Sequence, residues 1–363
     1  MATSKISELK AFVDCFPGQP IFLGADVHKN SYHIAILRAD GQMRTLVMPP
    51  SAQAILQLIQ RLGAPLGALA YESGPTSFVL ARVLEAEGLP VIVAAASRIP
   101  RPVTIGAKTD RLDCRKLARF AAKGLLRPIA VPTEEEEAER TLIRRRDQLG
   151  RSLRRCKQRI KSLLLEFNLP EPPGLKNWSK RAVAALSTMP LPDDALFTLQ
   201  SHLSELQFLF SQRDCVMRHL EKMGKKESHE RVLECLRSVP GVGPVVAAAF
   251  RLEVFQPERF RNAEELASYL GLAPVVRQSG EGKGHGRLRP TGKTVLRSLL
   301  IEAAWTFKRK DPQARAFYNK LLNRHGVPQK ALAAVARKLA VRLWRLCLEQ
   351  RPYELRPISQ ESQ

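Results

Sequence analysis

The spacing of hydrophobic and polar positions along this chain changes near residue 130. Before it, short apolar runs rich in β-branched residues alternate with turns and amphipathic segments, which predicts a domain of strands and helices. The expected strands, which share that composition, cover residues 21–26, 31–38, 41–48, 68–73 and 89–96. The expected helices, which combine helical spacing with Ser, Thr, Pro or Gly at their ends, cover residues 51–62, 75–88 and 109–124.

The order of these elements narrows the choice of fold. Three strands come first without an intervening helix, and the later strands alternate with helices. This order is that of an RNase H-like domain, although the periodicity alone supports only a mixed α/β fold.

Beyond residue 130 the pattern is helical. Residues 134–168 carry an apolar stripe at helical spacing and predict one long helix, which ends at the Pro-rich stretch 168–178. A second helical region over about 194–236 predicts the partner of that helix in an antiparallel pair. We therefore expect four parts, namely an α/β domain over 1–130, a helical coiled-coil linker over 131–237, a compact helical domain over 238–350 and a polar tail over 351–363.

The balance of charges predicts a polyanionic partner. The 363 residues contain 58 Lys and Arg against 35 Asp and Glu, which gives a net charge of +23. Such a surplus predicts attraction to nucleic acid, with an anionic membrane surface as the alternative. Aromatic residues make up only 6% of the chain, which argues against a stacking platform for single-stranded nucleic acid.

Several classes of protein are excluded by what the sequence lacks. No apolar run approaches the ~18 residues of a membrane-spanning helix, and the first residues have no secretory signal pattern. The six cysteines form no CxxC pair, which argues against a disulfide framework and a structural zinc site. We therefore expect a soluble cytoplasmic protein.

The expected long helix carries a dense run of cations. Nine Lys and Arg residues fall between positions 144 and 161, with Asp147 as the one acid among them. A solvated coiled-coil face is the plain alternative, but like charges on one helix repel one another unless a polyanion neutralises them. The nucleic-acid contacts expected on this helix are Arg144, Arg145, Arg151, Arg154 and Arg155.

Four carboxylates are candidates for a metal site. Asp26 and Glu72 end two predicted strands. Asp110 and Asp113 lie three residues apart at the start of a predicted helix and therefore share one helix face. Taken singly, each has an ordinary role as a turn, helix-start or ion-pairing residue. Together they form an oxygen-rich cluster suited to Mg²⁺ and to two-metal phosphoryl transfer.

The segment 273–305 is rich in glycine and in cations and predicts a phosphate-binding loop. Ser279 lies in it beside Gly280, and a serine hydroxyl can attack phosphorus if a base or a metal activates it. The alternative is a loop that binds the DNA backbone with Ser279 as one hydrogen-bond donor, and composition alone favours that interpretation. The spacing does not match the GxxxxGK[ST] nucleotide-binding loop. The cationic contacts expected here are Arg277, Lys283, Arg287 and Lys293.

The stretch SVPGVGP at 238–244 resembles the turn of a helix-hairpin-helix element. In such a turn the backbone amides, here at Gly241 and Gly243, contact phosphates without reading the base sequence. A tight glycine turn between two packed helices is an equally good interpretation.

Together these motifs resemble the insertion sequence 110 family of transposases, which is related to Piv-type DNA invertases. The resemblance rests on the DEDD carboxylates in GADVHKNSYHIAIL, YESGPTSFVL and KTDRLDCRKLA, followed by SVPGVGP and by LASYLGLAPVVRQSGEGKGHGRLRPTGKTVLRSLL. It covers nearly the whole chain, and the motifs come in the order that the family shows.

The resemblance implies a RuvC-like RNase H fold at the N-terminus, a coiled-coil linker and a C-terminal transposase domain that bears the nucleophile. It implies that the four carboxylates bind Mg²⁺ and that Ser279 forms a transient covalent link to DNA. It further implies a structured non-coding guide RNA that pairs with donor and target DNA, and homo-oligomers up to tetramers in which the serine of one subunit completes the acidic site of another. The implied location is the bacterial cytoplasm, at the nucleoid.

Three functions remain open from the sequence. The first is a DNA recombinase that uses Mg²⁺ and a serine nucleophile. The second is a RuvC-type structure-selective nuclease that uses the carboxylates and a metal-activated water, and the third is a nucleic-acid-binding protein without catalysis. The positive charge is concentrated on the long helix and over residues 238–363, which carry +12, and this favours nucleic acid over a membrane.

Overall fold

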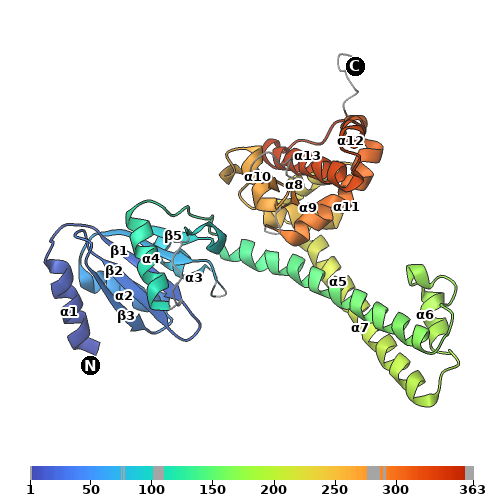
Figure 1. Ribbon diagram of the computed structural model, residues 1–363, viewed down its shortest axis with the longest axis horizontal. Coiled ribbons are helices and arrows are strands. Elements are labelled where there is room, and N and C mark those ends of the chain that lie inside the picture. The colour runs from blue at the N-terminus through green and yellow to red at the C-terminus, as the bar shows by residue number, and fades with distance from the viewer. Residues whose placement is uncertain are drawn as a thin grey trace, which may run out of the picture. The chain divides into compact units, whose positions relative to one another are not determined.

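The computed structural model describes residues 2–74, 76, 78–100, 110–275, 287–288 and 292–355. The chain divides into two compact units, Met1–Thr133 and Glu134–Gln363. The first unit combines a sheet with helices, and the second is mainly helical (Figure 1). The further division of the second unit into a linker and a C-terminal domain stays a prediction.

The sheet of the first unit has the strand order β3-β2-β1-β4-β5. The first three strands pair antiparallel, whereas β1–β4 and β4–β5 pair parallel. This mixed five-stranded sheet confirms the predicted RNase H-like order. The strands are β1 (Ile21–Val27), β2 (Tyr32–Leu37), β3 (Met43–Met48), β4 (Leu66–Glu72) and β5 (Val91–Ala94).

Helices cover both faces of this sheet. Along β1, Leu23 and Ala25 face one side and pack with the apolar stripes of three helices. The residues between them face the other side, which one helix covers through Leu117 and Ala118. On the first side lie α1 (Ala2–Asp14), α2 (Ala52–Leu62) and α3 (Val79–Ala86), and on the second lies α4 (Asp110–Ala122).

The sequence did not predict α1, which precedes the first strand. Its Leu9 and Val13 are buried in the same core as α2 and α3. The Arg38 guanidinium lies over the Phe12 ring, 4.4 Å from its centroid, and donates a 2.7 Å hydrogen bond to the Phe12 carbonyl oxygen. A cation that directly follows β2 therefore helps to hold this helix against the sheet.

Two long helices pair along the first part of the second unit (Figure 1). They are α5 (Glu134–Glu166) and α7 (Asp193–Gly224), and α6 (Lys180–Leu186) lies between them in sequence. Leu153 and Ile160 of α5 pack with Leu203 and Leu206 of α7 in one buried stripe. The helical spacing of these apolar positions explains why the helices pair and why their remaining faces stay polar.

The other helices of the second unit enclose one large core. They are α8 (Glu227–Arg237), α9 (Pro244–Glu253), α10 (Ala263–Leu270), α11 (Thr294–Lys310), α12 (Pro312–His325) and α13 (Pro328–Glu349), with a short pair of strands, β6 (Pro274–Val275) and β7 (Arg287–Leu288). The first turns of α5 join this core: Ile143 is buried in it, and Glu139 is paired with buried His229 of α8 at 2.9 Å. No helix in the described part of the chain is long and apolar enough to cross a membrane.

Candidate functional site

Two of the predicted carboxylates end neighbouring strands of the sheet. The parallel strands β1 and β4 pair Ala25 with Tyr71, so Asp26 and Glu72 are the next residues in register. Parallel neighbours lie ~4.8 Å apart and point to the same face of a sheet. Gly24 and Ala70, two residues earlier on each strand, face α4, so the two carboxylates face α4 as well.

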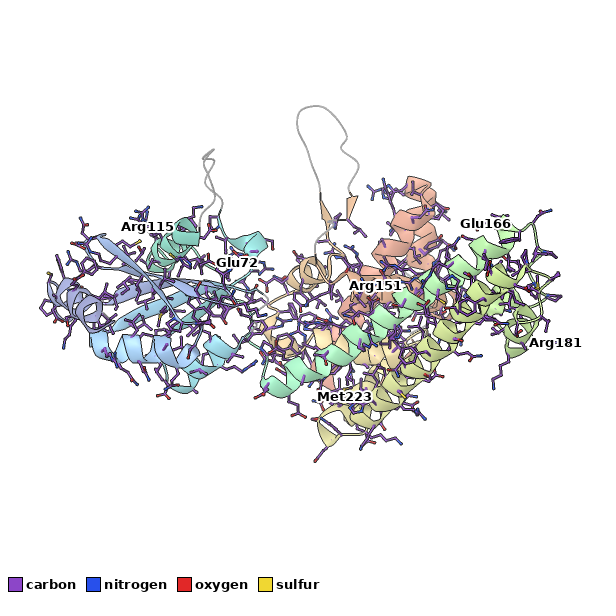
Figure 2. All side chains as sticks on the ribbon, turned by 90° about the horizontal axis from the view of Figure 1, so that it is seen from below. Glu72, Arg115, Arg151, Glu166, Arg181 and Met223 are labelled. Atoms are coloured by element: carbon purple, nitrogen blue, oxygen red, sulfur yellow. The ribbon has the colours of Figure 1, made fainter. Side chains whose placement is uncertain are left out.

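The helix α4 brings the other two acids to this edge. Its Cys114 and Ala118 lie against Gly24, and its Leu117 packs beside Ala70. The chain of α4 therefore starts near the carboxyl ends of β1 and β4. Asp113 directly precedes Cys114 in the first turn; Figure 2 shows Glu72 at the end of the sheet next to the helix that carries Arg115. Asp110 is the first residue of α4, and its side chain lies outside the described residues.

A glycine makes this approach possible. A Cβ on Gly24 would lie 2.0 Å from the Cys114 carbonyl oxygen and 2.5 Å from the Ala118 nitrogen. Both atoms belong to the backbone of α4, so no side chain can move aside to make room. The glycine in β1 therefore sets the distance between the strand that bears Asp26 and the helix that bears Asp113.

The electrostatic surroundings of Asp26 mix acids and imidazoles. His28 Nε2 lies 3.1 Å from Asp26 Oδ2, and His33 of β2 pairs with Asp26 across the antiparallel ladder. Burial raises the pKa of the Cys114 thiol to about 11, and the negative charge of Asp26 adds to that rise. Asp113 Oδ1 lies 3.5 Å from Lys116 Nζ.

The described carboxylates are of the type that binds metal ions, but they do not form a cluster by themselves. No group of three or more His, Cys, Asp or Glu side chains among the described residues is close enough to hold a metal ion. The two strand carboxylates nevertheless share one face in register, and carboxylate oxygens are the ligands that hard divalent ions prefer. The donor chemistry therefore fits such an ion, although the described side chains alone do not enclose one.

The predicted arginines of α5 all face solvent. They are Arg144, Arg145, Arg151, Arg154 and Arg155. The buried positions of the helix lie on its opposite stripe, for example Leu149 and Leu153. Arg151 forms an exposed ion pair with Asp147 at 2.9 Å and is labelled in Figure 2. An exposed ion pair contributes little to stability, so this guanidinium can exchange its partner for a phosphate.

The two glycines in the turn between α8 and α9 have different surroundings. Gly241 has a φ of +89°, and a Cβ there would lie 2.6 Å from the Ala303 carbonyl oxygen of α11. Gly243 precedes α9, is exposed and has no atom within 4 Å of its Cβ position. The geometry therefore supports the tight-turn interpretation for Gly241, whereas Gly243 is open to solvent.

The glycine-rich segment is only partly visible. Ser279, Arg277 and Lys283 lie outside the described residues. Arg287 is described in its backbone, which pairs with Val275 in the β6–β7 ladder. Lys293 directly precedes α11, and its Nζ lies 2.8 Å from Glu253 Oε2.

Gly24 and Glu253 were not identified from the sequence. A lone glycine inside a strand is a signal of close backbone approach, and it was available at Gly24. Glu253 gave no such signal because its partner Arg140 lies 113 residues away in the chain.

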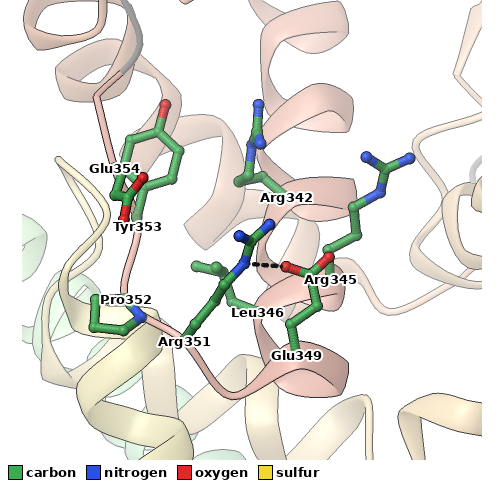
Figure 3. A pocket seen from close by; sticks show the side chains of 8 residues that line it. All are labelled: Arg342, Arg345, Leu346, Glu349, Arg351, Pro352, Tyr353 and Glu354. Carbon is green, nitrogen blue, oxygen red and sulfur yellow. Dashed lines mark hydrogen bonds and ion pairs between the residues drawn. The ribbon is translucent and has the colours of Figure 1, made fainter.

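A pocket of about 70 Å³ lies at the end of α13 (Figure 3). Its lining consists of Arg342, Arg345, Leu346, Glu349, Arg351, Pro352, Tyr353 and Glu354. It contains none of the predicted site residues, and two of its lining residues, Arg351 and Glu349, form an ion pair. The pocket therefore takes no part in the site described above.

Comparison with known proteins gives matches over both units. A DEDD transposase model of the IS110 group matches residues 23–169, and the model described as "Transposase IS116/IS110/IS902 family" matches residues 233–319. "Putative transposase y4qE" of Sinorhizobium fredii is 30% identical over 292 residues, which span 79% of this chain and 72% of that protein. The transposase for insertion sequence element IS1328 of Yersinia enterocolitica is 24% identical over 332 residues, 89% of this chain and 95% of its own.

The matched ranges coincide with the motifs already described. The first contains the four carboxylates, and the second contains the turn at Gly241 and the segment with Ser279. A DEDD transposase domain implies use of a divalent metal ion, and transposition implies DNA as the substrate. The chain therefore belongs to the IS116/IS110/IS902 family of transposases, enzymes that cleave DNA for the movement of insertion sequences.

Proposed function

We propose that this transposase cuts and rejoins DNA through Asp26, Glu72, Asp110 and Asp113 as Mg²⁺ ligands and Ser279 as nucleophile. The observation that carries this proposal is the register of β1 and β4, which sets two carboxylates side by side on the face where α4 begins. A bound Mg²⁺ supplies charge stabilisation to the attacking and leaving oxygens of the phosphoryl transfer.

The serine step conserves the energy of the broken bond. Ser279 Oγ loses its proton and forms a bond to phosphorus, while the bond from phosphorus to a DNA bridging oxygen breaks and that oxygen leaves as a hydroxyl after protonation. Attack by a hydroxyl of another DNA strand then reverses the step and frees the serine. Strand exchange of this kind needs no external energy source.

Sequence choice comes from a structured non-coding RNA in this proposal. The exposed arginine row of α5 grips a nucleic-acid backbone without reading bases. A protein that holds backbones can leave base recognition to pairing between guide and target. Family membership supports this proposal, as does the spread of charge over the second unit.

We also propose that the active form is a homo-oligomer, from a dimer to a tetramer. The described carboxylates lie in the first unit, and Ser279 belongs to the second. Assembly of several copies allows the serine of one subunit to serve the carboxylates of another. Cross-linking of the protein bound to its RNA and DNA tests this point.

The alternative function is a RuvC-type nuclease that cuts with water. A denaturing gel of the protein with labelled duplex DNA of the element ends separates the two functions. Under the serine proposal, Ser279→Ala abolishes both DNA cleavage and the protein–DNA adduct. The control is Ser298→Ala, which alters an exposed serine whose hydroxyl donates to the Thr294 carbonyl oxygen. The control changes neither cleavage nor adduct formation. Cleavage by Ser279→Ala at the wild-type rate refutes the proposal and supports the water mechanism.

Loss of the carboxylates tests the enzymatic function itself. Asp26→Asn keeps the size of the side chain and removes its charge, so we expect DNA binding without cleavage. Unchanged cleavage by Asp26→Asn contradicts the metal-site proposal. A wild-type protein that binds DNA but never cuts it indicates the non-catalytic function.

A further inference from the structure

The described residues that flank positions 276–286 pair with each other, and the chain then returns to the helical core at Gly292. Pro274 pairs with Leu288 in the β6–β7 ladder. Gly292 has a φ of +97°, and a Cβ there would lie 2.6 Å from the Gly271 nitrogen. The backbone that follows the segment is therefore pressed against the end of α10, where only glycine fits.

Lys293, the next residue, is tied down by its side chain. Its Nζ lies 2.8 Å from Glu253 Oε2 at the end of α9 and 5.5 Å from the centroid of the Tyr269 ring of α10. The Tyr269 hydroxyl in turn donates a 2.8 Å hydrogen bond to the Glu253 carbonyl oxygen. One lysine thus connects the start of α11 with the ends of α9 and α10.

Glu253 is a buried acid in a strongly basic unit. Its side chain is 11% exposed, and Arg140 Nη2 of α5, itself buried, approaches Oε2 at 3.3 Å. Burial by itself would raise the pKa of Glu253, but the charge and hydrogen bond of Lys293, then the charges of Arg140 and Arg144, hold it below its usual value. A buried carboxylate that stays charged depends on its partners, and removal of one partner is costly.

This arrangement pairs the charge of Lys293, whose side chain is 29% exposed, with a buried acid. The sequence predicted Lys293 as a nucleic-acid contact because it lies among other cations in a glycine-rich segment. In the structure its ammonium group neutralises Glu253, so a phosphate would have to compete with a buried carboxylate for it. At an exposed arginine such as Arg154, a phosphate does not have to compete with a buried carboxylate.

We propose that Glu253 and Lys293 are positioning residues for the transposition reaction, which hold the C-terminal attachment of the Ser279 segment against the core and do not bind nucleic acid. The inference rests on the proposed role of Ser279. A displacement of about 1 Å between a nucleophile and its target can lower a rate ~100-fold. A phosphate contact, in contrast, contributes about one unit to the salt dependence of binding.

The test compares Lys293→Met, Lys293→Arg and Glu253→Gln in the full-length protein, with Lys320→Met, on an exposed lysine of α12, as the matched control. DNA affinity is measured over a range of salt concentrations with a fluorescent duplex of the element end. The rate of adduct formation is measured with DNA at saturation, and thermal melting shows that each variant is folded.

We expect Lys293→Met and Glu253→Gln to lower the rate of adduct formation by ~10-fold to 100-fold, as displacement of the nucleophile does, with unchanged affinity and salt dependence. Lys293→Arg should keep most of the rate, because arginine can retain the ion pair. Lys320→Met should match the wild type. The rescue by arginine and the separation of rate from affinity distinguish positioning from a general loss of structure.

Two results would overturn the inference. One is a fall in the salt dependence for Lys293→Met with a normal rate at saturation, which marks a phosphate contact. The other is a wild-type rate for folded Lys293→Met. An adduct that persists in Ser279→Ala overturns the proposed function instead, so the two failures are distinguishable.

Discussion

Replacement of Gly24 by alanine tests the geometry of the carboxylate edge. The added Cβ would lie 2.0 Å from the Cys114 carbonyl oxygen, whereas Cβ contacts in proteins essentially never fall below 3.0 Å. The helix α4 must therefore withdraw from β1 by at least about 1 Å to reach even that lower limit. Because both atoms that it meets are helix backbone, local side-chain repacking gives no relief.

The expected effects follow from that displacement. Overpacking of a well-packed core costs about 1–3 kcal/mol, and this case belongs at the upper end. For a unit of this size such a loss lowers the melting temperature by on the order of 10 °C. Withdrawal of α4 also moves Asp113 from Asp26 and Glu72, so the folded variant should cleave DNA ~100-fold more slowly, as expected for a misplacement of about 1 Å.

The assay combines thermal unfolding followed by circular dichroism with DNA cleavage measured well below the melting temperature. Gly150→Ala is the matched control, since it adds the same methyl group in α5, where the nearest atom is the Arg154 guanidinium at 4.0 Å. DNA affinity should not change in either variant. A Gly24→Ala protein that melts and cleaves like the wild type refutes the packing of α4 on β1 and the metal-site geometry built on it.

Other predictions follow from charge and burial. Arg154→Ala and Arg155→Ala together should weaken DNA binding at low salt and reduce the salt dependence by about two units; an unchanged slope in a titration argues against α5 as a binding surface. Because the pKa of Glu253 is held low in the folded chain, its ion pairs stabilise the protein above the unfolded value of about 4.3 and are lost as pH falls through the folded value. Melting scans from pH 7 to pH 3 should therefore show a smaller acid-induced loss for Glu253→Gln than for the wild type, and parallel curves contradict this. A thiol reagent should label Cys15 and Cys215 in the native protein and all six cysteines in denaturant, because the other four are buried; rapid labelling of more than two indicates a looser core.

The sequence predicted most of the first unit because its signals are local. Alternation and β-branched runs located all five strands, and the Ser51 cap located the start of α2. The helix α1 lacked comparable signals, since its place depends on Arg38 lying over Phe12 from another element. The two-residue strands β6 and β7 are too short to leave a periodic pattern.

The sequence predicted less of the candidate site than of the first unit, because much of the site depends on contacts between distant segments. The sequence indicated that Asp26 and Glu72 end two strands, and the parallel pairing of β1 with β4 sets them side by side in register. The close approach of α4 at Gly24 and the pairing of Lys293 with Glu253 depend on contacts between distant segments. Composition can count such charges, but only the fold shows that Lys293 faces an internal acid.

The proposed function requires that Ser279 become covalently attached to DNA at a step that depends on the carboxylate edge. Mass spectrometry can test this on peptides from wild-type protein that is trapped with DNA of the element ends and digested to a nucleotide remnant. We expect a phosphonucleotide on Ser279 of the wild type and none on Ser279 of Asp26→Asn. DNA cleaved by the wild type with unmodified Ser279, or with the remnant on another residue, would contradict the proposed function.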